Sequence, residues 1–468
     1  MSTVNTDTRR PTLERKLGLG SAVSLNVMNM IGVGPFITLP LVVAAMGGSQ
    51  AILGWLLGAA IALCDGLVWA ELGAAMPEAG GSYAFLREIY GREGAGRWIS
   101  FLYVWQLGFS APLSIASGCI GLAQYAAYLW PALNVSLVGG HVSLVSLLAA
   151  ATSLFAVALL YRNLTAIARM AWIMTGGVLL TIGAVIVAGA THFHPAMLAA
   201  PHGAFAMNAG FFEGLGAATL LATYDYWGYY AVCFLGGEVR DPGRTIPRAV
   251  LWSIALVTAL YLGMQVSVLG VIPVRELTQT GAAKFAVVAV LMQRTFGVTA
   301  ARVLAVLVMW TAFASVFSLL LSYSRAPYAA ALDGNYFRAF AHLHPRHKFP
   351  DVSLLSLGLV AAVFCFFDLA AVIAALVAIR ILLQYVLQQI GVIVLRIKHP
   401  EMPRPFRIWL YPLPPLIALA GFLFIVFSRK QASHELLDAA IVAGSGSVIY
   451  FFRAFRRGEW PFASKISG

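Results

Sequence analysis

The sequence predicts an all-α integral membrane protein with twelve transmembrane helices, and three observations lead to this fold class. Of the 468 residues, 60% are apolar and only 11% are Asp, Glu, Lys or Arg, whereas a soluble domain carries about 25% charged residues. The apolar residues gather in runs of about twenty, the length that crosses a bilayer as a helix. Most of the 31 Lys and Arg residues lie in alternate segments between these runs, which is the positive-inside pattern.

The twelve apolar runs are the candidate membrane spans. They cover residues 17–46, 51–76, 96–129, 142–161, 166–191, 212–236, 248–272, 300–324, 352–367, 370–396, 408–428 and 435–455. The basic segments place the N-terminus inside the cell, and an even number of spans returns the C-terminus to the same side. We therefore expect a multi-pass protein of the cell membrane with cytoplasmic tails at 1–16 and 456–468. The turn around Asp368 must be tight.

Two segments between the spans, 77–96 and 275–299, have the pattern of short interfacial helices. In the first, Ala84 and Phe85 lie opposite Arg87, which predicts a helix at the inner membrane interface. The second predicts a helix that caps the outer side. The four cysteines stand singly in apolar runs, without the spacing of a metal site, so we expect no metal and no cofactor. No catalytic motif is present, which argues against an enzyme. The net charge of +12 comes mostly from Lys and Arg in the segments between the apolar runs, which argues against a nucleic-acid binder.

The first span contains a break in its helical pattern. Gly32, Gly34 and Pro35 stand together near its centre; proline removes an amide donor and glycine lowers helix stability. Unpaired backbone in hydrocarbon costs several kcal/mol per group, so a break persists only where it lines a cavity or is buried in protein. A simple proline kink is the alternative.

The sixth span, 212–236, contains the second break. Asp225 lies among aromatic residues at its centre and Gly228 follows; an ionisable group at that depth costs about 2.5–3.5 kcal/mol unless it faces a polar cavity. The broken spans are five apart, so 17–191 and 212–396 become two units of similar length, with two further helices in 408–455. Interrupted helices at matching positions of two halves indicate a secondary transporter with inverted repeats.

Four stretches of sequence also carry a family resemblance. They are NMIGVGPF (29–36), WAELGAAMPEAGGSYAFLRE (69–88), GGEVRDPGRTIPRAV (236–250) and RAPYAAALDGNYF (325–337). On these residues the chain resembles the amino acid–polyamine–organocation (APC) superfamily across nearly its whole length, with features of its polyamine and L-type amino acid branch. The resemblance implies a five-plus-five inverted repeat of the leucine-transporter type plus two C-terminal helices. It also implies an amino acid permease that works by alternating access, proton-linked or as an exchanger. A polyamine transporter and a transporter-like nutrient sensor are the alternatives.

The resemblance also implies a substrate site between the two breaks. Exposed amides of the first break would hold a carboxylate and exposed carbonyls of the second an amino group. The implied contacts are Ile31, Gly32, Val33, Gly34, Thr223, Tyr224, Asp225 and Tyr226. Val33 and Pro35 depart from the family's usual Gly-Ser-Gly-Ile-Phe; they remove a hydroxyl and an amide donor, which weakens carboxylate recognition. Gln106 and Ser110 are candidates for the cavity wall, and Trp227 for an aromatic lid.

The buried and helix-end charges have several interpretations. Asp225 beside aromatic rings suits an organic cation; it could anchor a substrate amine, carry a proton or be paired internally. Asp65 in the second span is the other proton-coupling candidate. Arg380 in the tenth span either faces the cavity or is paired. The helix-end charges form inner-gate ion pairs or are solvated; these are Glu71, Glu238, Arg240 and Arg244.

Overall fold

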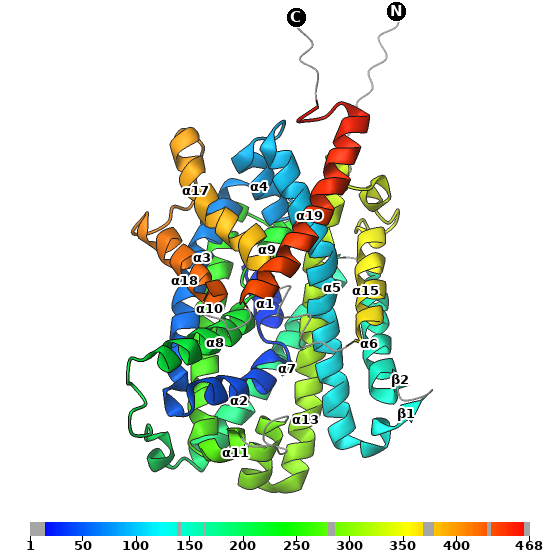
Figure 1. The fold of residues 1–468 in the computed structure, drawn as a ribbon. Helices are drawn as coiled ribbons and strands as arrows, with labels where there is room; N and C mark the ends of the chain where they lie inside the picture. The colour runs from blue at the N-terminus through cyan, green and yellow to red at the C-terminus, as the bar shows by residue number, and fades with distance from the viewer. Residues whose placement is uncertain are drawn as a thin grey trace, which may run out of the picture.

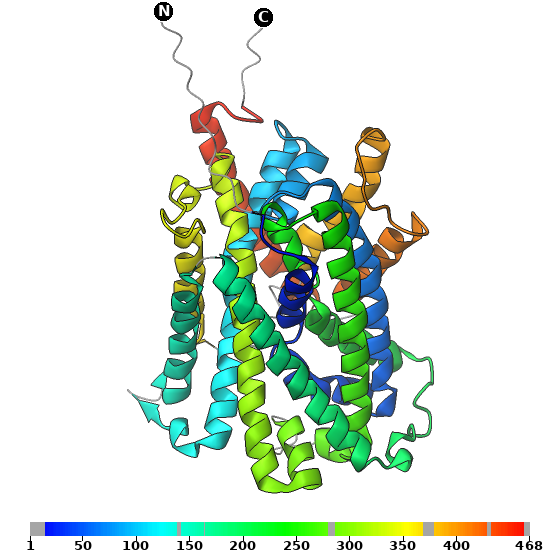
Figure 2. The same ribbon diagram turned by 180° about the vertical axis from the view of Figure 1, so that it is seen from behind.

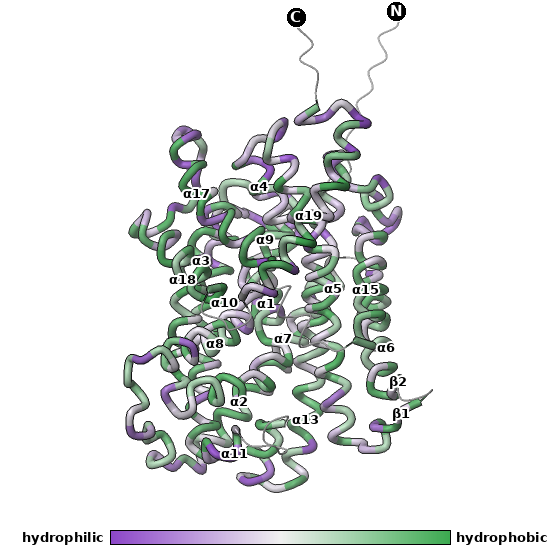
Figure 3. The backbone as a smooth tube through the Cα atoms, in the orientation of Figure 1, coloured by the Kyte–Doolittle hydropathy of each residue, from purple (hydrophilic) through white to green (hydrophobic). Residues whose placement is uncertain are grey.

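The computed structural model describes residues 15–137, 142–162, 164–278, 286–367, 379–427 and 432–462. They form a bundle of helices whose long axes run mostly in one direction (Figure 1). Helix α4 (Ser82–Tyr90) lies at one end, and the short hairpin of β1 (Ser136–Leu137) and β2 (Val142–Ser143) lies at the other. These are called the α4 end and the hairpin end. Hydrophobic residues cover the middle of the bundle, and hydrophilic residues gather towards the two ends (Figure 3).

Seven helices in the described part of the chain are long and apolar enough to cross a membrane. They are α3 (Ile52–Ala75), α5 (Ala95–Leu129), α7 (Leu164–Thr191), α10 (Pro242–Leu269), α13 (Val287–Tyr323), α17 (Leu387–Lys398) with the π-helical turn before it (Ile381–Val386), and α19 (Ala432–Arg457). Three shorter apolar helices are α6 (Leu144–Leu160), α15 (Asp351–Phe364) and α18 (Leu413–Phe427). The chain is therefore a helical, multi-pass membrane protein, as the composition predicts.

The first predicted span consists of two helices. Helix α1 (Leu19–Met30) ends at Met30, and α2 (Gly34–Met46) begins after three intervening residues, at an angle of 48° to α1. Pro35 occupies the second position of α2, where the missing amide costs no hydrogen bond because the first-turn amides have no partner in the helix. The predicted break is thus present, and it is a sharp bend with irregular backbone at 31–33.

The predicted span at 212–236 is also interrupted. Helix α8 (Ala209–Tyr226) ends at Trp227, and the chain continues through an irregular segment to α9 (Ala231–Phe234) and a short 3-10 turn, η5 (Gly236–Glu238). Gly228 has a φ of 128°, which glycine adopts without strain. A Cβ on Gly228 would lie 2.7 Å from the backbone carbon of Asn29, so this break lies against the end of α1.

One hydroxyl connects the two breaks. Tyr261 of α10 lies with its hydroxyl oxygen 2.8 Å from the carbonyl oxygen of Met30 and 3.1 Å from that of Asp225. Each of these carbonyls lies at the end of a helix, where the regular hydrogen bonds stop. The side chain of Tyr261 is fully buried, so the contact is an internal link between the ends of α1 and α8.

Two other predicted segments differ from expectation. Helix α4 is not a surface helix, because seven of its nine residues, Arg87 included, are buried; ion pairs described below account for the buried charge. The predicted outer helix at 275–299 is instead α11 (Val274–Thr278) and the first turns of α13, which is interrupted at Gly297, with φ 85°. Residues 279–285, like the predicted tight turn around Asp368, lie outside the described residues.

The two ends of the described chain lie together at the α4 end (Figures 1 and 2). Leu17 forms a β-bridge with Val239, and Glu459 forms an ion pair with Arg97 at a distance of 3.0 Å. Figure 2 shows α7 crossing the bundle diagonally beside α1, where the hydroxyl of Thr175 donates to the carbonyl of Ser24. The break in the first span is therefore enclosed by neighbouring helices.

Candidate functional site

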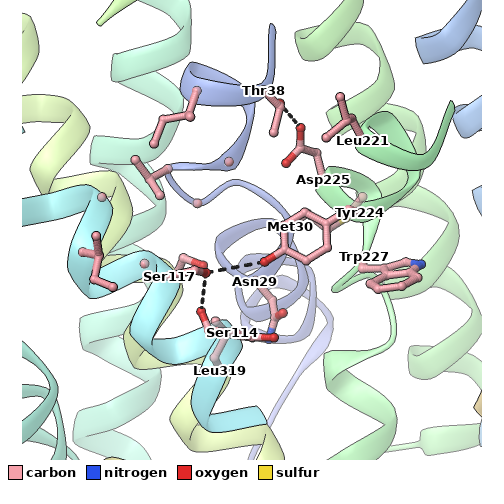
Figure 4. Close-up of a pocket in the computed structure, with 18 of the residues that line it drawn as sticks. Asn29, Met30, Thr38, Ser114, Ser117, Leu221, Tyr224, Asp225, Trp227 and Leu319 are labelled. Carbon is pink, nitrogen blue, oxygen red and sulfur yellow. Dashed lines mark hydrogen bonds between the residues drawn. The ribbon is translucent and has the colours of Figure 1, made fainter. Parts of the chain in front are cut away.

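A cavity of about 530 Å³ lies between the two helix breaks. Its walls come from the α1–α2 break, from α5, from the end of α8, from α13 and from Arg380 just before the π-helical turn. Figure 4 shows part of this lining, with Tyr224 directed towards Ser117 across the cavity. A volume of this size is typical of small-molecule sites.

Six of the residues implied by the resemblance line this cavity. They are Gly32, Val33, Gly34, Tyr224, Asp225 and Trp227. The other candidates are buried but stand behind its wall; these are Ile31, Gln106, Ser110, Thr223 and Tyr226. The structure adds lining residues that the sequence did not single out, above all Thr38, Ser114 and Ser117. Thr38 lies four residues after Gly34, so helical spacing alone could have identified it.

The carboxylate of Asp225 lies at the amino end of α2. Its Oδ2 accepts a hydrogen bond from the hydroxyl of Thr38 (Figure 4). A Cβ added to Gly34 would overlap Oδ1 of Asp225, so a side chain at position 34 would force this carboxylate to move. The positive end of a helix dipole favours an anion at this position. Oδ1 has no hydrogen-bond partner among the described residues.

The amides of the first break remain available. Neither the Val33 amide nor the Gly34 amide donates a hydrogen bond to any residue that the structure describes. The Gly32 amide makes only a local contact, 3.2 Å from the carbonyl of Met30. The break therefore presents backbone donors towards the cavity, next to the carboxylate of Asp225.

Arg380 supplies a positive charge to the same cavity. Its guanidinium carbon lies 5.6 Å from the ring centroids of both Trp227 and Tyr323, and its Nη2 donates to the hydroxyl of Ser114 at 3.3 Å. Among the described residues, no carboxylate lies within ion-pair distance of it. The sequence left open whether Arg380 is paired internally or faces the cavity; in the described structure it lines the cavity.

A layer of stacked aromatic rings begins at Trp227, which lines the cavity. Trp227 stacks on Tyr385 with ring centroids 4.9 Å apart, and Tyr230 stacks on Trp69 at 4.5 Å. The hydroxyl of Tyr385 donates to that of Tyr230 at 2.9 Å. Trp227, the predicted lid, therefore packs within this aromatic layer.

Ion pairs join distant segments of the chain. Glu238 pairs with Arg325 at 2.9 Å, and both side chains are 3% exposed. Glu71 pairs with Arg396 at 2.9 Å and lies 3.5 Å from Arg404. In α4, Arg87 pairs with Asp333 of the segment after α14 (Arg325–Leu332) and with Glu78.

Of the four predicted gate residues, only the two acids take part in these pairs. Glu71 and Glu238 bind arginines from distant segments of the chain. Arg240 and Arg244 are exposed, and neither forms an ion pair with a described residue. The partner of Glu238 is instead Arg325 of α14.

Asp65, the other buried acid, lies away from the cavity. It accepts hydrogen bonds from the hydroxyl of Tyr229 at 2.5 Å and from the amide of Gln389. It thereby connects α3 with the second break and with α17. Hydrogen bonds to its partners account for its complete burial.

Comparison with known proteins finds a family model and several relatives that match most of the chain. The family model described as amino acid permease matches residues 17–436. The serine/threonine exchanger of Bacillus subtilis is 26% identical over 445 residues, which cover 94% of this chain and 97% of the relative. The mouse Asc-type amino acid transporter 1 is 28% identical, covering 96% and 83%. The methylthioribose transporter of Bacillus subtilis is 25% identical, covering 96% of both.

All three relatives are named as transporters and none as an enzyme, in agreement with the sequence prediction. The family match spans most of the chain, including both helix breaks and every lining residue of the cavity. The chain belongs to the amino acid permease family of the APC superfamily.

Proposed function

We propose that the protein is a secondary active transporter that moves an amino acid across the membrane by alternating access. The observation that carries this proposal is the cavity between two interrupted helices, with unpaired amides at one break and a carboxylate at the other. Half-helix ends at the centre of a membrane are the usual means by which transporters bind small charged substrates. The names of the relatives support amino acids as the substrate class.

The proposal includes the arrangement of the whole chain. Residues 17–191 and 212–396 form two inverted five-helix repeats, and 408–455 adds two helices, for twelve spans in total. The α4 end, where Arg87, Arg396 and Arg404 lie, is cytoplasmic by the positive-inside rule, and both termini are on that side. Because the aromatic layer and ion pairs close this end, the structure corresponds to a state closed to the cytoplasm.

Polyamines are the alternative substrate, with Asp225 as the amine anchor. The charge of Arg380 in the same cavity argues against them, because like charges in a low-dielectric site repel strongly. A transporter-like nutrient sensor is the other alternative, and it would bind a ligand without moving it.

The test is uptake by the purified protein in proteoliposomes. We expect saturable uptake of at least one radiolabelled amino acid from a panel that includes serine, threonine and alanine. Putrescine and spermidine should be neither transported nor competitive. Uptake of polyamines alone would replace the proposal with the polyamine alternative, and binding without uptake would indicate a sensor.

Replacing Asp225 by asparagine should reduce uptake about 10- to 150-fold. The expected loss corresponds to one charge-assisted hydrogen bond to the substrate amine, about 1.5–3 kcal/mol. The protein could transport by proton-linked symport or by exchange. Uptake by Asp225→Asn and by Asp65→Asn should therefore be measured at several external pH values. Loss of pH dependence in one variant identifies the proton carrier. Wild-type uptake and pH dependence in Asp225→Asn would show that this acid has neither role.

A further inference from the structure

The guanidinium of Arg380 is a buried positive charge that lacks a negative partner in the described structure. The residue is only 4% exposed. Its contacts are two aromatic ring faces and one serine hydroxyl. A buried charge requires an opposite charge or several hydrogen bonds, and these contacts supply neither. Such a cation in a cavity wall has the chemistry of an anion-binding group.

Among the described residues, Arg380 uses only one of its donors. A guanidinium carries five N–H donors in a planar fork that fits a carboxylate. One of these donors is used, by the hydroxyl of Ser114, and no other acceptor for them is present among the described residues. Because Arg380 lines the cavity, a carboxylate inside the cavity could take both charge and hydrogen bonds from it.

The family resemblance places the substrate carboxylate at the amides of the first break, but the carboxylate of Asp225 already lies there. Oδ1 of Asp225 lies against Gly34, and Oδ2 is bonded to Thr38 in the first turns of α2. The side chain of Asp225 thus occupies the space at the amino end of α2. A substrate carboxylate has less room there and is better placed elsewhere in the cavity.

Arg380 and Asp225 face the same small volume. Arg380 contacts Ser114 of α5 at 3.3 Å, and the hydroxyl of Tyr224, the neighbour of Asp225, lies 3.4 Å from Oγ of Ser117. The two serines are three residues apart on one helix, which is a rise of about 4.5 Å. The cation and the acid are thus on the walls of one cavity of about 530 Å³.

We infer that Arg380 binds the carboxylate of the transported substrate while Asp225 binds its ammonium group. This inference rests on the proposed function and deepens it. The site selects compounds that carry both an ammonium and a carboxylate group, and the carboxylate is bound by a side chain of the tenth predicted span. A primary amine without a carboxylate leaves Arg380 unpaired, and a polyamine places a second positive charge against it.

The experiment compares each amino acid with its decarboxylated amine. Binding of the twenty L-amino acids to the purified full-length protein is measured by calorimetry or thermal shift, and the tightest ligand is paired with the amine that lacks only its carboxylate. We expect wild type to prefer the amino acid at least 100-fold. Arg380→Gln should bind the amino acid about 100-fold more weakly and the amine unchanged, and Arg380→Lys should fall between. Arg302→Gln removes an exposed arginine of α13 and should behave as wild type.

The ratio of the two affinities is the deciding quantity, because a purely structural role for Arg380 would weaken both ligands together. A folded Arg380→Gln that keeps the wild-type ratio overturns the inference. Selective loss of aspartate and glutamate alone also overturns it, since Arg380 would then read an acidic side chain. If the glutamine variant does not fold, the wild-type ratio decides: equal affinity for amino acid and amine overturns the inference, and a 100-fold preference that Arg380→Lys reduces supports it. If the protein transports amino acids but Arg380→Gln keeps the wild-type affinity ratio, the inference fails and the proposed function stands. If the protein binds amines and no amino acid, both the inference and the proposed function are overturned.

Discussion

Replacing Gly34 by leucine will abolish transport while the protein still folds. A Cβ at this position would overlap Oδ1 of Asp225, and the carboxylate would have to leave the amino end of α2. The substitution therefore removes the anion from the helix end and fills the cavity with an apolar side chain. We expect uptake to fall at least 100-fold, measured in proteoliposomes with the amino acid that wild type transports best.

The matched control for this substitution is Gly183→Ala on α7. No atom lies within 4 Å of a Cβ added there, so the exchange should leave uptake unchanged; because alanine favours a helix over glycine, it should not lower the thermal midpoint. Gly34→Ala tests the same contact with a smaller side chain and should retain partial activity at most. A Gly34→Leu protein that is folded and transports at the wild-type rate would show that the close approach of Gly34 and Asp225 is irrelevant to function.

The second large effect is expected at the ion pair between Glu238 and Arg325. Both side chains are 3% exposed and their charged atoms lie 2.9 Å apart. Removing one member leaves a buried, uncompensated charge, which typically costs about 3–5 kcal/mol. Arg325→Met should therefore lower the thermal midpoint of the purified protein clearly, because Glu238 keeps its charge without a partner.

The double variant Glu238→Leu, Arg325→Met tests whether the loss of stability comes from the unpaired charge of Glu238. Since replacing both members of a buried pair by apolar residues is often neutral, the double variant should regain most of the lost stability. Arg240→Met is the control. This neighbouring arginine is exposed and forms no ion pair with a described residue, so its replacement should change the thermal midpoint very little. An Arg325→Met protein as stable as Arg240→Met would contradict the prediction.

The sequence predicted the features of the fold that depend on local chemistry. Glycine and proline at 32–35 weaken a helix wherever they stand, so the bend in the first span followed from composition. An acid within an apolar run is costly unless it faces a polar cavity, so the position of Asp225 indicated such a cavity, and Asp225 lines one.

The contacts between distant segments could not be read from the sequence. Arg380 and Ser114 are 266 residues apart in the sequence, and Glu238 and Arg325 are 87 residues apart. Neither separation is one that a single helix or turn brings into contact. The burial of α4 has the same origin: its pattern is that of an interfacial helix, but Arg87 is neutralised by Asp333 and Glu78. Tyr261 had no local signal, because its role depends on two carbonyls from other helices.

The hydroxyl of Tyr261 links the backbone of one break to the backbone of the other. A phenol hydroxyl carries a single proton, yet the carbonyls of both Met30 and Asp225 lie within reach of it. Met30 has a second donor in the amide of Gly32, 3.2 Å away, whereas the carbonyl of Asp225 has no other donor among the described residues. Two acceptors thus compete for one proton. When that proton moves from one carbonyl to the other, the bonding at one break is strengthened and that at the other is weakened, so the two breaks are coupled through a single hydrogen atom.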